Sequence, residues 1–304
     1  MPRRVVGDRH LQTTMAPDGR VLTFAEWGDL EGSPLIFLHG TPGCRLSRHP
    51  NQELVRSTGA HVVIYDRPGY GGSDRHPERR ISDCVWDVVA IADAMGFDRF
   101  AVKGGSGGGP HALAAAALLG DRITRVACSV GLAPYEAFGD TWTDGMDPEN
   151  VKEFGWAASG EKTLAAELTR EDAAIRERVA IDPANVLGAF ELPESDRAVL
   201  AQSDSSEVTR EEVAEETRNG VWGWVDDDLA FLQPWGFDLA AIRVPTAVWY
   251  GLDDVMTPPA HGQWLATHVP GALVRAQKGG HLGSESAMAE LNRWLIDGRP
   301  WDRA

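Results

Sequence analysis

The sequence predicts an α/β fold in which helices cover both faces of a mostly parallel sheet. Short apolar runs rich in β-branched and aromatic residues recur along the chain without apolar–polar alternation, as in strands buried on both faces. Helical patterns alternate with these runs, which is typical of a parallel sheet. The length of 304 residues fits one such unit.

The expected strands follow from these runs and from the Gly, Pro or Asp residues at which they end. A hairpin opens the sheet, because Pro17-Asp18-Gly19 separates two strand-like runs. The expected strands cover residues 11–15, 21–26, 35–38, 61–65, 100–103, 126–130, 246–250 and 272–276.

The expected core helices lie between the strands. Residues 81–95 place Val85 and Ala92 on one face, with Ser82 as the N-terminal cap and Gly96 as the stop signal. Residues 110–119 are almost entirely apolar, which predicts a buried helix. The expected core helices cover residues 81–95, 110–119, 260–268 and 285–295.

The alternation of strands and helices breaks between residues 130 and 246. Polar amphipathic helices are expected at residues 161–168, 171–179 and 210–218. We interpret residues 134–235 as a helical cap domain over one end of the sheet. Residues 1–133 and 236–304 then form the core domain.

The cap segment carries the whole net charge of the chain. Residues 134–235 contain 24 Asp and Glu against 8 Lys and Arg. The net charge of this segment is therefore −16, the same as that of the full sequence. This acidity argues against a nucleic-acid partner, which needs a basic surface, and against an anionic membrane. It also disfavours strongly anionic substrates.

Other features indicate a protein of the reducing cytoplasm. The three cysteines, Cys44, Cys84 and Cys128, are too few and too scattered for a disulfide framework or a zinc site. No apolar secretory region is visible in residues 1–12, and no apolar stretch reaches membrane-spanning length. We therefore expect a small-molecule substrate. The sequence leaves the oligomeric state open.

A candidate nucleophile lies in Gly104-Gly105-Ser106-Gly107-Gly108. This run follows an expected strand and precedes an expected helix, which is the context that a Gly-x-Ser-x-Gly turn requires. The small neighbours let strand and helix approach closely, so the Ser106 hydroxyl projects above the sheet. The alternative is a glycine-rich turn with an incidental serine.

A candidate oxyanion hole lies in His39-Gly40-Thr41-Pro42-Gly43, directly after another expected strand. A serine that attacks a carbonyl generates an oxyanion, which needs two preorganised N–H donors. We expect these donors from Gly107 and Thr41. His39 is expected to pack structurally rather than act as the base, and it is also a candidate for substrate binding.

Candidates for the acid and the base follow the last two strands. Asp253 and Asp254 follow the strand at 246–250, where a carboxylate can orient a histidine. His281 stands in a small-residue loop after the last strand. The order Ser106, Asp, His281 is the one found in α/β-hydrolases.

These motifs make the chain resemble the α/β-hydrolase superfamily over essentially its whole length. The segment from Tyr65 to Ser73 is similar to the structural Asp-x-Arg-Gly-x-Gly-x-Ser turn of that family. The acid turn of the family resembles Gly-x-x-Asp-x-x-x-Pro, which implies Asp254. The resemblance implies a Ser106–His281–Asp254 serine hydrolase of the esterase type, with a helical cap, an acyl-enzyme intermediate, no metal and no organic cofactor.

Several alternatives stay open at this point. The proline iminopeptidases of the family typically have a Gly and a Trp where this chain has Thr41 and Gly107, but the acidic cap keeps an aminopeptidase possible. Cofactor-free haloperoxidases and C–C bond hydrolases use similar triads. A ligand-binding receptor on the same fold, with vestigial hydrolysis, is the alternative from another functional class.

Within the cap, Trp222 and Trp224 are the candidates for lining an apolar substrate pocket, because flanking glycines free their backbone. At least three of the five cap tryptophans are expected to pack helices onto the sheet. The run Asp226-Asp227-Asp228 predicts a solvated turn or helix cap rather than a metal site.

Overall fold

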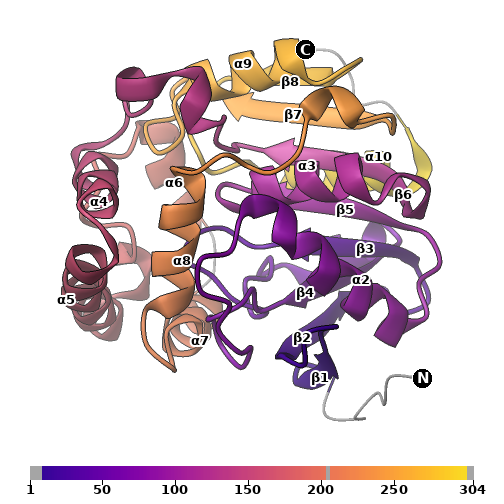
Figure 1. The fold of residues 1–304 in the computed structure, drawn as a ribbon, viewed down its shortest axis with the longest axis horizontal. Helices are drawn as coiled ribbons and strands as arrows, with labels where there is room; N and C mark the ends of the chain where they lie inside the picture. Colours follow the sequence, from indigo (N-terminus) through magenta and orange to yellow (C-terminus); the bar gives the residue numbers. More distant parts are fainter. Residues whose placement is uncertain (1–8, 203–205, 300–304) are drawn as a thin grey trace.

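The computed structural model describes residues 9–202 and 206–299, which contain one eight-stranded sheet (Figure 1). Its strands are β1 (Gln12–Met15), β2 (Val21–Gly28), β3 (Ser33–Leu38), β4 (Ala60–Tyr65), β5 (Phe100–Gly105), β6 (Ile123–Ser129), β7 (Thr246–Gly251) and β8 (Leu273–Gln277). Their order is β1-β2-β4-β3-β5-β6-β7-β8, and only the β1–β2 and β2–β4 pairs are antiparallel. The predicted mostly parallel sheet is therefore confirmed.

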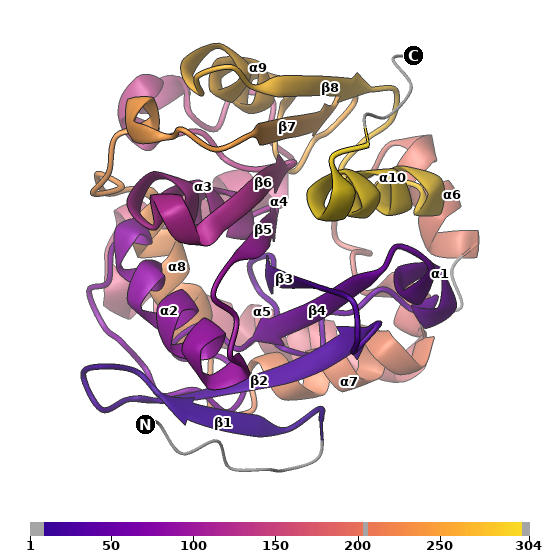
Figure 2. The ribbon, with the colours of Figure 1, turned by 90° about the vertical axis from the view of Figure 1, so that its right-hand side faces the viewer.

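Helices cover both faces of this sheet, as Figure 2 shows. They are α1 (Gln52–Ser57), α2 (Cys84–Met95), α3 (Gly108–Leu118), α9 (Pro259–His268) and α10 (Glu285–Asp297). Val88 of α2 and Leu113 of α3 belong to the core on one face, whereas Val55 of α1 and Leu291 of α10 belong to the core on the other. The sequence predicted four of these helices and missed the short α1.

Residues 134–235 form helices that stand beside the sheet, on the left of Figure 1. They are α4 (Pro148–Ala158), α5 (Glu161–Ile181), α6 (Glu194–Gln202), α7 (Ser206–Glu216) and α8 (Trp222–Phe231). Helix α5 is one continuous helix where the sequence predicted two, because neither Gly nor Pro interrupts it. Leu164, Leu168 and Trp224 form a small core of this segment with Tyr70.

Short 3₁₀ turns complete the described structure at Ile81–Asp83, Gly120–Arg122, Tyr135–Ala137, Gly139–Thr141, Pro183–Asn185 and Leu239–Ala241. Across residues 9–202 and 206–299, none of the helices combines the length and the apolar character needed to span a bilayer. The loops that follow β3, β5, β7 and β8 all leave the same edge of the sheet, because these strands run parallel. That edge therefore gathers the predicted chemical groups.

Candidate active site

Ser106 lies on a sharp turn between β5 and α3. Its backbone has a φ of +51°, which is uncommon for residues other than glycine. Glycines allow the close approach that the turn needs, because a Cβ on Gly104 would lie 2.1 Å from the Gly108 carbonyl oxygen. The Ser106 carbonyl accepts a hydrogen bond from the Gly109 N–H at 2.8 Å. This geometry fits a partly exposed nucleophile on a strained strand-to-helix turn.

His281 and Asp254 form a hydrogen-bonded pair at the ends of β8 and β7. His281 Nδ1 lies 2.9 Å from Asp254 Oδ2. The other oxygen of Asp254 accepts the N–H groups of Met256 and Thr257, each at 2.9 Å. The Asp253 side chain instead accepts the Gly279 N–H at 3.3 Å and is exposed. The structure thus pairs Asp254 with His281.

The Asp254 carboxylate changes the acid–base behaviour of the imidazole. Burial alone would lower the pKa of His281, but the charge and hydrogen bond of Asp254 outweigh it and raise the pKa above the ordinary value of 6.5. A basic ring with its Nδ1 proton fixed on a carboxylate leaves Nε2 as the proton acceptor. No hydrogen bond joins Ser106 Oγ to His281 within the described residues, and such bonds are often absent before a substrate binds.

The cap segment holds the loop that carries His281. Asp196 in α6 is fully buried and accepts the backbone N–H groups of His281 at 2.8 Å and Leu282 at 3.1 Å. Ser195 Oγ accepts the Gly280 N–H at 3.1 Å. Sequence reasoning missed Asp196, because its partner is 85 positions away and nothing in the local pattern marks it.

The two predicted oxyanion residues lie beside Ser106 and against each other. A Cβ on Gly40 would lie 3.6 Å from Ser106 Cβ, which places the loop after β3 next to the serine. A Cβ on Gly107 would lie 2.3 Å from Thr41 Oγ1, so the two residues approach as closely as a glycine permits. The structure therefore brings Thr41 and Gly107 together at Ser106.

A cavity of about 370 Å³ connects these groups to the cap, and Ser106, His281 and Thr41 all line it. Its apolar walls come mainly from the cap segment. The apolar and aromatic lining residues are Trp156, Ile175, Val186, Leu187, Phe190, Leu200, Val213, Trp224, Met256 and Leu282. A mostly apolar pocket over a polar reactive end is typical of small-molecule sites.

The cavity also contains carboxylates, and among the residues that the structure describes its lining includes neither lysine nor arginine. These acidic residues are Glu149, Glu153, Glu171, Glu212 and Glu216. Burial raises the pKa of Glu153 to about 7 and raises that of Glu216 well above its usual range. Burial therefore favours the neutral form of these two carboxyl groups, and a cationic group beside them would favour the charged form. The sequence located the acidity in the cap but did not identify these residues.

Two predicted substrate-binding residues lie outside this cavity, and their assignment is corrected. His39 is fully buried behind it, where its Nε2 accepts the Arg67 N–H at 3.2 Å. Trp222 is 38% exposed and stacks under the Arg75 guanidinium, 4.2 Å from the ring centre. The predicted Trp224 does line the cavity, and its Nε1 donates to Glu153 Oε1 at 2.9 Å.

The run Asp226–Asp228 is buried in α8, so the prediction of a solvated turn is wrong. Asp226 and Asp227 tolerate burial because each carboxylate forms ion pairs with two arginines of the core, at distances of 2.5 to 3.2 Å. These arginines are Arg67, Arg75 and Arg79. Within the described residues, no cluster of His, Cys, Asp and Glu has the arrangement of a metal site.

Known proteins with similar sequences include a chloroperoxidase and several proline iminopeptidases. A non-heme chloroperoxidase of Streptomyces lividans is 32% identical over 146 residues, 47% of this chain and 52% of that protein. A proline iminopeptidase of Xanthomonas citri is 34% identical over 33% of each chain. A proline iminopeptidase of Neisseria gonorrhoeae is 26% identical over 87% of this chain and 88% of that one. The chain thus spans between a third and about half of the first two relatives.

Solved structures with similar folds cover nearly the whole chain. The enol-lactonase of Burkholderia xenovorans LB400 aligns with a TM-score of 0.65 and 18% identity over 94% of this chain and 98% of that one. A thermophilic esterase of Thermogutta terrifontis aligns with a TM-score of 0.64 and 20% identity over 97% of this chain and 99% of that one. At these identities the likeness concerns the fold. The family model described as the alpha/beta hydrolase fold matches residues 33–287, and the chain therefore belongs to the α/β-hydrolase family.

Proposed function

We propose that this protein is a serine hydrolase that cleaves a small-molecule ester, with Ser106 as nucleophile, His281 as base and Asp254 as its orienting acid. The observation that supports this most strongly is the 2.9 Å hydrogen bond between His281 and Asp254 in a cavity that Ser106 also lines. Thioesters and amides are cleaved by the same chemistry and belong to the same proposal.

The proposed reaction has two steps. His281 Nε2 takes the Ser106 proton as Oγ attacks the carbonyl carbon, and the Thr41 and Gly107 N–H groups hold the resulting oxyanion. His281 then protonates the leaving group, so that an acyl-enzyme remains on Ser106. Water, deprotonated by His281, attacks this ester and releases the acid, and Oγ recovers its proton.

Turnover of a panel of p-nitrophenyl esters tests this proposal. We expect hydrolysis by the wild type and a kcat at least about 10⁴-fold lower for Ser106→Ala, because triad members act as a unit. Equal rates for the two proteins would contradict the assignment of Ser106. The outcome that favours the ligand-binding receptor is different. In that case Ser106 reacts with a fluorophosphonate, but the protein turns over no ester, thioester or amide.

The carboxylates of the cavity favour a second candidate, an aminopeptidase-type hydrolase whose substrate carries a free ammonium group. Glu216 is 6% exposed and lines the cavity, where a substrate ammonium group would favour its ionised form and pair with it. Relatives named proline iminopeptidase are consistent with this candidate. Release of p-nitroaniline from prolyl- and alanyl-p-nitroanilide, but not from their N-acetylated forms, would support it. Hydrolysis confined to esters would exclude it.

A further inference from the structure

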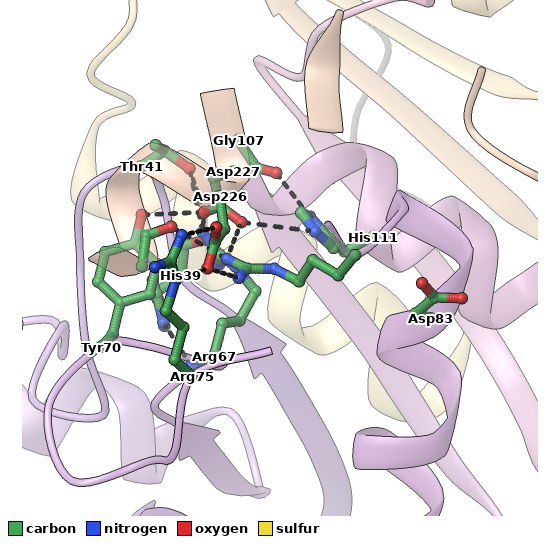
Figure 3. Close-up of polar contacts among 12 residues, drawn as sticks. His39, Thr41, Arg67, Tyr70, Arg75, Asp83, Gly107, His111, Asp226 and Asp227 are labelled. Atoms are coloured by element: carbon green, nitrogen blue, oxygen red, sulfur yellow. Dashed lines mark hydrogen bonds and ion pairs between the residues drawn. The ribbon is translucent and has the colours of Figure 1, made fainter. Parts of the chain in front are cut away.

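Asp227 forms hydrogen bonds or ion pairs with several residues near the candidate active site (Figure 3). It lies in α8, within the segment proposed as the cap, and its side chain is fully buried. None of the reaction steps above uses it. A buried charge needs compensating partners, so the identity of those partners indicates what Asp227 does.

One oxygen of Asp227 is directed at the loop that follows β3. Thr41 Oγ1 donates to Asp227 Oδ2 at 2.8 Å, and Tyr70 donates to the same oxygen at 2.9 Å. Arg67 Nη2 donates to it at 2.5 Å. Asp227 therefore contacts the side chain of a proposed oxyanion residue.

Arg67 extends this contact along the same loop. Its guanidinium donates to the Gly40 carbonyl at 2.9 Å, to Thr41 Oγ1 at 3.0 Å and to the His39 carbonyl. The Thr41 hydroxyl thus accepts from Arg67 and donates to Asp227, which fixes its rotamer from both sides. Asp227 in turn accepts a hydrogen bond from the same Arg67 Nη2 and so helps to orient the guanidinium.

The other oxygen of Asp227 lies on the side of the serine turn. Arg79 donates to Asp227 Oδ1 at 2.8 Å, and His111 Nε2 lies 3.8 Å from it. His111 Nδ1 donates to the Gly107 carbonyl at 2.9 Å, a role fixed by the fact that a carbonyl only accepts. With its proton on Nδ1, the neutral His111 ring donates no hydrogen bond from Nε2 to Asp227, so Asp227 acts on the proposed oxyanion hole from the Thr41 side.

Asp227 keeps its charge in this environment. Burial alone would raise the pKa of Asp227, but the two arginines hold it well below its usual range. The carboxylate therefore accepts all these hydrogen bonds at any pH near neutrality. Since the Thr41 hydroxyl packs against the Gly107 backbone, holding this hydroxyl also sets the distance between the two proposed N–H donors.

We propose that Asp227 is a positioning residue for the oxyanion hole, acting from the cap helix through the hydroxyl of Thr41. This inference rests on the proposed function, because it assigns a role within the same reaction. It predicts a loss of rate rather than of substrate affinity, since the oxyanion forms only in the transition state.

The neighbouring Asp226 provides a matched control. It is also buried in the same helix and forms ion pairs with Arg75 at 2.8 Å and Arg79 at 3.2 Å, but its partners within the described part of the chain do not include the oxyanion loop. Asp227→Asn and Asp226→Asn each remove one buried charge from a pair of arginines. A purely structural role predicts similar effects of the two changes.

The experiment measures kcat, KM and the rate of Ser106 phosphonylation by a fluorophosphonate, which also places an oxygen in the hole and needs no known substrate. We expect Asp227→Asn to lower kcat and the phosphonylation rate by about 10- to 100-fold, somewhat less than deleting a donor costs, with KM within about threefold. Asp226→Asn should stay within about threefold of the wild type on all three quantities. Equal rates for the two variants would overturn the proposal.

A second pair of variants covers the case in which Asp227→Asn does not fold. Thr41→Val removes only the hydroxyl that contacts Asp227, and Thr41→Ser keeps it. We expect Thr41→Val to slow phosphonylation by about tenfold or more, and Thr41→Ser to lose clearly less. The same loss in both would overturn the proposal. A wild type that is not phosphonylated at all would contradict the proposed function, whereas fast labelling of every variant would contradict only the role of Asp227.

Discussion

Asp253 and Asp254 are adjacent in the sequence, but the turn after β7 gives them different environments. Asp254 is 2% exposed and contacts His281, whereas Asp253 faces solvent. Local residue patterns left this choice open, and only the resemblance to a family turn favoured Asp254. The difference arises from backbone direction, because the Met256 and Thr257 N–H groups fix the Asp254 carboxylate.

Substitution of the two aspartates should separate their roles. We expect Asp254→Asn to lower kcat by about 10⁴-fold, because the amide disfavours the tautomer in which His281 Nε2 accepts a proton. Asp253→Asn should leave kcat within about twofold. Steady-state kinetics on one p-nitrophenyl ester measures both, and the reverse ranking would assign the acid to Asp253.

The pH dependence of kcat/KM should report the raised pKa of His281. Activity requires the neutral ring, so the rate should rise with pH and reach half its plateau above pH 6.5, because Asp254 stabilises the imidazolium. The residual activity of Asp254→Asn should have its acid limb at lower pH. An acid limb at the same pH in both proteins would show that this limb does not belong to the His281–Asp254 pair.

At the scale of elements, the core was predictable and the cap was only partly so. The core strands follow from apolar runs, which local sequence carries. Helix α8 was not predicted, and its run of three aspartates was expected to be exposed to solvent. The residues that make α8 a buried helix are Arg67, Arg75 and Arg79, about 150 positions earlier, and their pairing with it is a tertiary effect that local patterns do not contain.

Strand β5 contains a partly buried cation, Lys103, three residues before Ser106. Within the described residues, its hydrogen bond goes to Asn292 Oδ1 at 3.4 Å and no carboxylate pairs with it. Burial lowers its pKa from 10.5 to about 8. A folded-state pKa below the unfolded one means that the lysine costs stability below about pH 8, and that this cost disappears as the pH rises toward 10.5.

Lys103→Met should therefore stabilise the protein by up to roughly 3 kcal/mol at pH 7, with a smaller gain at pH 10. Urea unfolding at the two pH values measures the difference. Lys162→Met, at an exposed position of α5, is the control and should show no such change. A gain for Lys103→Met that does not depend on pH would contradict the electrostatic explanation.

At the scale of the whole molecule, the negative charge is concentrated where a substrate would bind. The cap segment carries the entire net charge of −16, and glutamates from this segment line the cavity above Ser106. Composition revealed the first fact. The second depends on how α4, α5 and α7 are oriented, which the sequence did not define. The substrate class therefore depends on tertiary structure, whereas the proposed reaction type rests on motifs.

Removal of a cavity charge should change substrate preference. We expect Glu216→Gln to lower the ratio of kcat/KM for an aminoacyl p-nitrophenyl ester to that for a neutral ester of equal size by about tenfold or more, because a buried charge pair is lost. Glu207→Gln, on the exposed face of the same helix α7, should leave the ratio unchanged. A ratio that is the same in all three proteins would mean that the cavity carboxylates do not select cations.

The central claim, that Ser106 is the nucleophile, is tested most directly by mapping the site of fluorophosphonate modification with mass spectrometry. We expect one adduct per chain, on the peptide that contains Ser106, and its complete loss in Ser106→Ala. We also expect much slower formation in Asp254→Asn, because His281 activates the serine through its contact with Asp254. An unmodified wild type, or an adduct that persists in Ser106→Ala, would contradict the account.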